Sequence, residues 1–184
     1  RARQILAMRD GRFGEASKLA TQVAQRAPSS RSWFDVGSVL AAGDRCADAI
    51  SAFERSLASD SAYVPSRLGL AECAIEEGNV AVALKQVEAV RRIDSTALSE
   101  SDYALHRGRA LARVGRYAEA DSAFRAMFAA SPVDSGSAFR WLAQLQMMRG
   151  RYGEALQMMN ASTRLVRQSG DAQALFSNLV IEAT

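Results

Sequence analysis

The sequence predicts an all-α fold built from a pair of helices that recurs about every 34 residues. Three observations predict it: a short phrase is repeated, the distance between its copies is nearly constant, and apolar residues follow it at helical spacing. The phrase reads DGRFGEA at 10–16, VGRYAEA at 114–120 and RGRYGEA at 149–155. Self-similarity of this kind is typical of repeat architectures, whereas a catalytic motif is rarely needed three times.

An alanine near the end of each phrase defines the period. Successive copies of this alanine are 33, 34, 37 and 35 residues apart, at Ala16, Ala49, Ala83, Ala120 and Ala155. Mostly apolar or small residues stand four positions later, at Ala20, Phe53, Val87, Phe124 and Met159, and seven positions later, at Val23, Ser56, Val90, Met127 and Ser162. This spacing lies on one face of a helix. Small residues also stand twelve positions earlier, at Gly37, Ala71, Gly108 and Ala143, where two helices could cross closely.

Glycine and proline predict where the helices end. Gly11, Gly78, Gly115 and Gly150 each stand five residues before the repeated alanine, with Asp44 as the exception. We expect these glycines to adopt the left-handed conformation that reverses the chain between two helices. The three prolines fall at predicted boundaries, Pro28 and Pro132 after helices and Pro65 at the start of one.

In the stretch SWFDVGSVLAAGDRCADAISAFERSLASDS, a fixed pattern of aromatic, small and aliphatic positions is filled by Trp33, Gly37, Leu40, Ala49 and Phe53. On these residues the sequence resembles the tetratricopeptide repeat family over residues 1 to about 169, with no particular member identified. The resemblance implies an all-α, right-handed superhelical solenoid of helix-turn-helix repeats. The family pattern is broken where Arg67 and Ala104 replace its tryptophan, Arg107 its leucine and Arg167 its final proline.

We therefore expect one solenoid domain over residues 1–184. It comprises a partial repeat 1–29, repeats 30–63, 64–97, 101–134 and 136–169, and a C-terminal helix 171–182. The helices are expected at about 1–10, 14–27, 31–42, 45–58, 65–77, 79–92, 101–114, 118–130, 137–149 and 152–167. Because the chain begins at Arg1 rather than Met, we expect a fragment or a processed form, and the incomplete repeats at both ends predict a longer solenoid.

Composition narrows the class of protein. No apolar run approaches the roughly 20 residues that cross a bilayer, so this segment predicts no membrane span. The net charge is only +3 although the pI is about 9.2. The arginines are spread over both helices of every repeat without an aromatic-basic platform, which argues against nucleic-acid binding.

The sequence contains no recognisable catalytic or metal-binding pattern. His106 is the sole histidine, and neither a metal-ligand spacing nor a phosphate loop occurs, so we expect no enzyme activity, no metal and no cofactor. Cys46 and Cys73 are expected to stay unbridged, because an antiparallel pairing about residues 61 and 62 offsets them along the helices. Free thiols fit the cytoplasm, whereas a signal outside this segment would allow a periplasmic or extracellular location.

The resemblance implies a protein-binding scaffold that holds a peptide or helix of a partner protein in a concave groove formed by the first helix of each repeat. The groove residues are expected to be Phe34, Ser38, Leu68, Glu72, Ile75, Glu76, Leu105, Arg109, Arg113, Arg140, Gln144, Met147 and Met148. The lysine and asparagine pattern with which some members hold chaperone tails is absent. The alternative is a structural subunit of a bacterial envelope, secretion or filament assembly, favoured by apolar Leu175, Phe176 and Leu179 and involving self-association.

Two like-charged pairs in this groove leave a choice open. Glu72 with Glu76, and Arg109 with Arg113, stand four residues apart on their helices and repel each other. The opposite charge that relieves the repulsion could come from the other pair or from a charged ligand.

Overall fold

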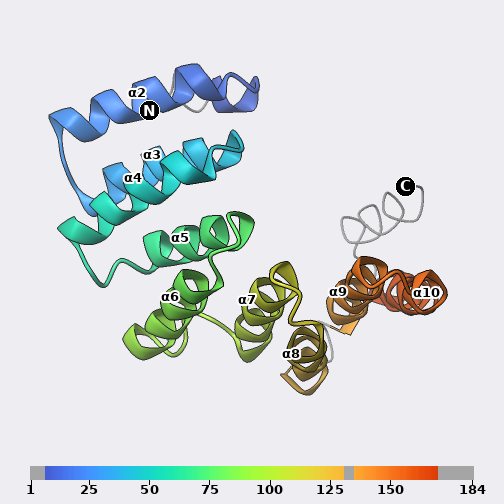
Figure 1. Cartoon of the computed structure of the whole chain (residues 1–184). Helices are drawn as coiled ribbons and strands as arrows, with labels where there is room; N and C mark the ends of the chain where they lie inside the picture. The colour runs from blue at the N-terminus through green and yellow to red at the C-terminus, as the bar shows by residue number, and fades with distance from the viewer. Residues whose placement is uncertain (1–6, 131–134, 170–184) are drawn as a thin grey trace. The chain divides into compact units, whose positions relative to one another are not determined.

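The computed structural model describes residues 7–130 and 135–169, which form α-helices joined by short loops (Figure 1). In chain order the helices are α2 (Phe13–Arg26), α3 (Ser30–Ala42), α4 (Cys46–Ser59), α5 (Val64–Glu76), α6 (Val80–Ile93), α7 (Glu100–Arg113), α8 (Tyr117–Ala130), α9 (Ser135–Met148) and α10 (Tyr152–Ser169). Residues 7–9 are also helical, and no strand occurs in the described ranges. The predicted all-α repeat fold is confirmed.

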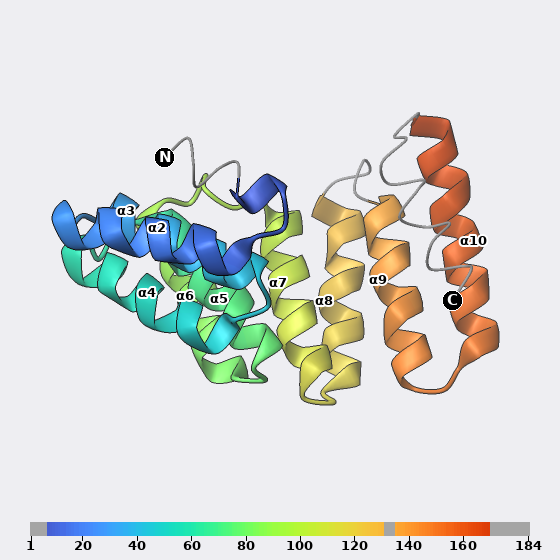
Figure 2. The same cartoon turned by 90° about the horizontal axis from the view of Figure 1, so that it is seen from above.

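Packing divides the chain into two compact units, Arg1–Ala97 and Leu98–Thr184. In the first unit each helix from α2 to α6 packs on the next, and α3 also contacts α5. In the second unit α7, α8, α9 and α10 lie side by side in chain order (Figure 2). The division falls where the predicted repeat 64–97 ends, and the single solenoid over residues 1–184 stays a prediction.

The helix ends lie within two residues of those predicted from the sequence wherever a whole helix is described. For example, the predicted 45–58 corresponds to Cys46–Ser59, and the predicted 137–149 to Ser135–Met148. The predicted helix 171–182, with Leu175, Phe176 and Leu179, lies outside the described residues, as does Pro132.

The predicted left-handed glycines explain why the repeated phrase contains a glycine. Gly11, Gly78, Gly115 and Gly150 have φ of 72°, 74°, 77° and 73°, and Asp44, the exception in the sequence, has φ 57°. The same pair of hydrogen bonds closes each turn: Gly115 N–H donates to Ala112 O (3.0 Å), and Arg116 N–H donates to Leu111 O (3.0 Å). This is the pairing with which a left-handed residue ends a helix and satisfies its last carbonyls.

The arginine and the acidic residue of the phrase form an ion pair at the start of the next helix. Arg116 Nη2 lies 2.6 Å from Glu119 Oε2, and Arg45 Nη2 lies 2.6 Å from Asp48 Oδ2. The same pair joins Arg12 to Glu15 and Arg151 to Glu154. These side chains are about half exposed, so water screens the attraction and each pair contributes little to stability. In the repeat 64–97, Asn79 takes this place, and its side chain accepts a hydrogen bond from Val82 N–H.

The alanine of the phrase marks the crossing of two helices. Ala16, Ala49, Ala83 and Ala120 have no exposed surface and Ala155 is 4% exposed. A buried phenylalanine four residues later fills the space beside a glycine. A Cβ added to Gly37 would lie 2.5 Å from the Phe53 ring, and Phe53 is 1% exposed. Phe124 fills the space beside Gly108 in the same way.

Buried serines tie the two helices of a repeat together seven residues after the alanine. Ser56 Oγ donates to Ser30 O (2.7 Å), and Ser162 Oγ donates to Gly136 O (2.7 Å). Both bonds span 26 residues and satisfy a carbonyl in the first turn of the preceding helix. Polar contacts as well as apolar packing therefore recur from one repeat to another within this chain.

Cys46 of α4 and Cys73 of α5 form a disulfide, so the prediction of two unbridged thiols is wrong. Ser66 Oγ donates to Ser56 Oγ (2.6 Å), as an antiparallel pairing about residues 61 and 62 predicts, but the expected offset of about four residues, or ~6 Å along the helices, does not hold at the cysteines. A second error was to treat Cα atoms as if they lay on the helix axes. They lie about 2.3 Å away from the axis, so facing Cα atoms come several Å closer than the axes. The two Cα atoms are 4.9 Å apart, and the thiol argument for a cytoplasmic location therefore fails.

Candidate protein-binding surface

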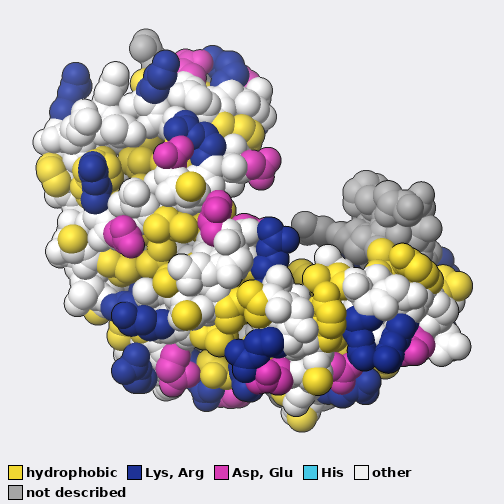
Figure 3. All heavy atoms as spheres, viewed as in Figure 1, with side chains coloured by type: hydrophobic (Ala, Val, Ile, Leu, Met, Phe, Trp, Pro, Cys, Tyr) yellow, Lys and Arg dark blue, Asp and Glu magenta, His cyan; other side chains and the backbone are white. Residues whose placement is uncertain are grey.

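The first helix of each repeat offers the surface on which the predicted groove residues stand. These first helices are α3 and α5 in the first unit and α7 and α9 in the second, and we refer to their outward side chains as the leading-helix surface of each unit. Figure 3 shows apolar side chains close to charged ones over these helices in both units. Each unit is described by itself.

In the first unit the leading-helix surface is built around Phe34. Its ring lies 6.0 Å from the ring of buried Phe53 and 5.9 Å from the ring of Tyr63, and the guanidinium of Arg31 lies 5.8 Å from its centroid. Phe34 remains half-buried, as does Leu68 on the neighbouring α5. The aromatic ring is thus fixed by the core and still presents part of its surface.

Polar and acidic residues continue this surface along α3 and α5. Ser38 and Glu72 are half-buried and Glu76 is exposed. Ile75 is only 3% exposed, so it belongs to the packing between helices rather than to a surface that a partner could contact. At 3.6 residues per turn, Ile75 is turned about 60° from Glu72, toward the side of the helix where Ala71 is buried.

In the second unit the surface is basic and centred on Trp141 of α9. The Arg109 guanidinium on α7 lies 5.4 Å from the Trp141 ring centroid, and that of Arg140 lies 6.0 Å from it. The Trp141 ring stacks on Phe124, with centroids 5.9 Å apart and an interplanar angle of 17°. The structure therefore brings two of the predicted groove residues, Arg109 and Arg140, to one aromatic ring.

Sequence reasoning did not select Trp141. The corresponding positions of the other repeats hold Asp35, Gly69 and His106, so the tryptophan belongs to no repeated pattern. A large aromatic side chain in a position that is small or polar in every other repeat was the available signal. Trp141 is partly buried against the core of the second unit, and its Nε1 atom is buried without a hydrogen-bond partner in the described structure.

The remaining predicted residues of the second unit lie along the same helices. Leu105 is half-buried on α7, and Arg113 is exposed at its end. On α9, Gln144 is exposed, Met147 is 39% exposed and Met148 is 47% exposed. Flexible methionines at a surface adapt to differently shaped apolar partners.

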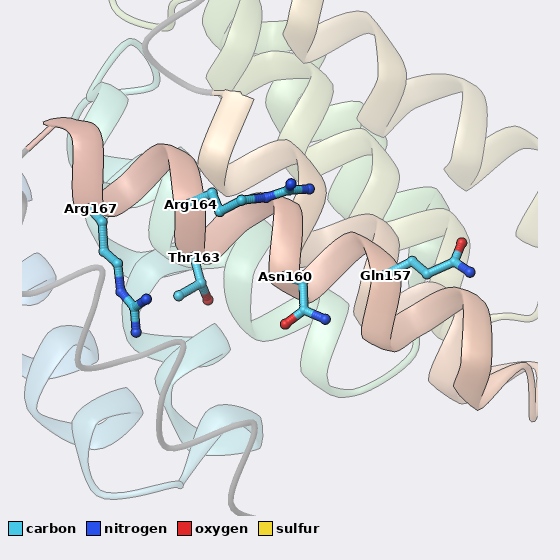
Figure 4. A pocket seen from close by; sticks show the side chains of 5 residues that line it. All are labelled: Gln157, Asn160, Thr163, Arg164 and Arg167. Carbon is cyan, nitrogen blue, oxygen red and sulfur yellow. The ribbon is translucent and has the colours of Figure 1, made fainter.

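Two hollows are lined mostly by residues outside the leading helices. One, of about 460 Å³, is lined by Gln157, Asn160, Thr163, Arg164 and Arg167, which Figure 4 shows on successive turns of α10. The other, of about 600 Å³ in the first unit, is lined by Gly14, Ser17, Lys18, Thr21, Gln22, Leu40, Arg45 and Asp48. Neither lining combines a nucleophile with a histidine base.

The described residues contain no group of three or more histidine, cysteine, aspartate or glutamate side chains that could hold a metal ion. Within the same ranges, none of the helices combines the length and the apolar character needed to span a bilayer.

Comparison with protein families identifies the repeat. One tetratricopeptide repeat model matches residues 40–104, and a second matches residues 5–64 and 105–172. No curated protein matches the chain.

Solved structures share the fold over nearly the whole chain. MamA AMB-1 is 21% identical, with 91% of this chain and 98% of that chain covered and a TM-score of 0.65. TTC0263, a thermophilic TPR protein of Thermus thermophilus, is 17% identical, with 96% and 95% covered and a TM-score of 0.67. A double mutant of MamA RS-1 is 15% identical, with 94% and 95% covered and a TM-score of 0.71. At these identities the likeness shows the fold alone.

Proposed function

Since this chain belongs to the tetratricopeptide repeat family, we propose that it is a non-catalytic scaffold that binds a segment of a partner protein along its leading-helix surfaces. The family generally mediates protein–protein interactions. The partner segment is a peptide or a helix, and its binding requires neither a metal nor a cofactor.

The observation that carries the proposal is the apolar surface that the leading helices leave uncovered. Met147 and Met148 are 39% and 47% exposed at the end of α9, beside exposed Gln144. The core of the second unit is complete without them, since Leu142 and Leu145 of the same helix are each 1% exposed. Apolar side chains that do not serve the core favour a binding role.

Charge on these surfaces favours a partner with separated charges. Glu72 and Glu76 lie on α5 in the first unit, whereas Arg109 and Arg113 lie on α7 and Arg140 on α9 in the second. A basic group of a partner would complement the acidic surface of the first unit, and an acidic group would complement the basic surface of the second. Such complementarity raises the association rate most at low ionic strength.

The test is capture of a partner by the full chain, followed by charge reversal. Arg109→Glu with Arg113→Glu is expected to weaken binding of the captured partner, more at low salt than at high salt, with the helical circular dichroism unchanged. Lys85→Glu with Arg92→Glu changes the net charge equally on exposed positions of α6 and serves as the matched control. If the affinity changes neither with the charge reversal nor with the salt concentration, the partner binds outside these surfaces.

A second candidate function, a structural subunit that self-associates, is favoured by α10. Tyr152 is 71% exposed and Leu156 is 60% exposed, whereas Tyr117, at the equivalent position of the preceding repeat, is partly buried against the core. An apolar face of this kind could stack on another copy. Sedimentation of the wild type and of Leu156→Glu over a range of concentrations tests it: association that the substitution abolishes supports stacking, and a monomer at every concentration rejects it.

A further inference from the structure

The Trp141 ring is held rigidly at the leading-helix surface of the second unit. One face of the ring stacks on Phe124, which is 1% exposed and packed beside Gly108. The ring therefore cannot sink further into the core or turn without disturbing it. Such a fixed aromatic surface is suited to positioning the side chains that lie over it.

Two guanidinium groups lie within cation–π distance of this ring. Arg109 reaches it from α7 at 5.4 Å and Arg140 from α9 at 6.0 Å. Cation–π attraction is effective within about 6 Å of the ring centroid, so the indole orders both side chains. Two cations ordered around one ring also raise the local positive potential, which favours a bound anion.

Like Arg55 over Trp33, Arg140 makes its cation–π contact without a carboxylate partner among the described residues. Over the described ranges, no aspartate or glutamate forms an ion pair with it. Arg31 makes a comparable contact with Phe34, but its Nε also lies 3.1 Å from Asp35 Oδ1, four residues along the helix. Four residues after Arg140 the chain has the neutral Gln144 instead. The ordered charge of Arg140 is thus left for an anion from outside the chain.

The indole N–H of Trp141 adds a hydrogen-bond donor to the same region. Its Nε1 atom is buried and finds no acceptor in the described part of the chain. A buried donor without an acceptor is rare in folded proteins and is a reason to look for a missing acceptor. The Arg140 guanidinium and the indole N–H both bind negatively polarised oxygen atoms, and of the two only the guanidinium is reached from the surface.

The exposed methionines indicate which side chain the ligand carries besides its carboxylate, and at what distance. Met147 and Met148 lie seven and eight residues after Arg140 on α9, which places them about 11 Å along the helix axis. An extended peptide covers that distance in about three residues. The surface therefore fits a peptide with a carboxylate and a bulky apolar side chain three residues apart.

We propose that Arg109, Arg140 and Trp141 form a binding site for an aspartate or glutamate side chain of a partner peptide, with Met147 and Met148 receiving an apolar side chain three residues away. This inference rests on the proposed scaffold function and names the chemistry of the partner at the second unit. Arg140 supplies the charge, and Trp141 positions it.

The fluorescence of Trp141 gives a direct measurement. The chain has two tryptophans, so Trp33→Phe leaves Trp141 as the sole reporter. In this background we would titrate an acetylated and amidated peptide that repeats Glu-Thr-Thr-Leu, in which threonine favours an extended chain and the only carboxylates are side chains, against its Gln-Thr-Thr-Leu counterpart. We expect the acidic peptide to change the Trp141 emission saturably and to bind at least tenfold more tightly than the neutral one, with the difference shrinking at high salt.

Substitutions separate this site from general charge effects. Arg140→Gln is expected to remove most of the preference for the acidic peptide, and Met147→Ser with Met148→Ser to weaken both peptides. Arg151→Gln removes an exposed arginine that directly precedes α10 and pairs with Glu154, and it is the matched control. Equal affinity for the two peptides, no response to the acidic peptide at millimolar concentration, or an unchanged preference in Arg140→Gln would overturn the inference.

Failure of this site and failure of the scaffold function give different results. Suppose that a captured partner binds the Arg140→Gln protein as tightly as the wild type. This result would support the scaffold function and reject the carboxylate site. A phosphopeptide could also be tested in competition with the acidic peptide, with Trp141 fluorescence as the readout. If the phosphopeptide binds more tightly, phosphate rather than carboxylate is the ligand and the proposal is rejected.

Discussion

Gly108→Ala should destabilise the second unit, although alanine favours helices more than glycine does. A Cβ at this position would lie 2.6 Å from Cδ1 and 2.9 Å from Cζ of Phe124, and closest of all to Cε1. Comfortable carbon contacts are about 3.5–4.0 Å, so the overlap is about 1 Å. The ring has no free direction, because it is 1% exposed and stacked on Trp141.

The expected magnitude combines two opposing effects. Overpacking of a rigid core costs about 1–3 kcal/mol, and an overlap with a fixed ring belongs in the upper half of that range. Replacing glycine by alanine inside a helix contributes about 1 kcal/mol of stability in the other direction. We therefore expect a net loss of about 1–2 kcal/mol in the free energy of unfolding.

Urea unfolding followed by tryptophan fluorescence measures this loss, since Trp141 reports on the affected core. Gly153→Ala is the matched control, because Gly153 lies in α10 of the same unit and a Cβ there meets nothing within 4 Å. It should leave the protein equally or slightly more stable, and adding Phe124→Leu to Gly108→Ala should recover part of the loss. A Gly108→Ala protein as stable as the wild type would refute the reasoning about the helix crossing.

The repeat, the disulfide and an ion pair each give a further prediction. Ala120→Leu places a large side chain at a position with no exposed surface and should cost about 1–3 kcal/mol in thermal or urea unfolding; unchanged unfolding would mean that the crossing is misplaced. Reducing the Cys46–Cys73 disulfide, which closes a loop with a sequence separation of 27, should cost about 3.5 kcal/mol by the chain-entropy relation and should raise amide exchange in residues 7–97 but not in 98–169. The Arg116 hydrogen bond lowers the pKa of Glu119 below its usual value of 4.5, so the stabilisation is present above about pH 4.5 and is lost as the pH falls through the lowered pKa. Arg116→Gln should raise that pKa in an NMR titration, and an unchanged value would contradict the pairing.

Local features of the sequence were enough to predict the helices. The repeated alanine sets the period, and the glycine five residues earlier sets the left-handed turn, so the ends of α5 and α9 could be placed within two residues. These signals act within a few residues of chain. They also predicted the burial of Ala120 and of Phe124, because both lie on the face that every repeat uses for packing.

Features that depend on how closely two helices approach could not be predicted in the same way. The disulfide required the distance between facing Cα atoms of α4 and α5, which helical spacing alone does not provide. Ile75 was placed on the surface because the helical pattern tolerates about 60° of rotation, which is enough to turn a side chain inward. Trp141 was missed because its position is not repeated, and a site that distinguishes one repeat from the others is invisible to a method that looks for what the repeats share.

The disulfide has a mechanical consequence, because it joins the second helix of one repeat to the first helix of the next. If the chain were pulled from its two ends, helices would peel away along the array, but α4 and α5 could not be drawn apart. The loop between Cys46 and Cys73, with a sequence separation of 27, would remain closed, which withholds about 90 Å of contour length from the extended chain. At this junction the tension would be carried by the covalent bond between two sulfur atoms, and at the other junctions by helix packing. The junction between α4 and α5 would therefore open on reduction rather than under force.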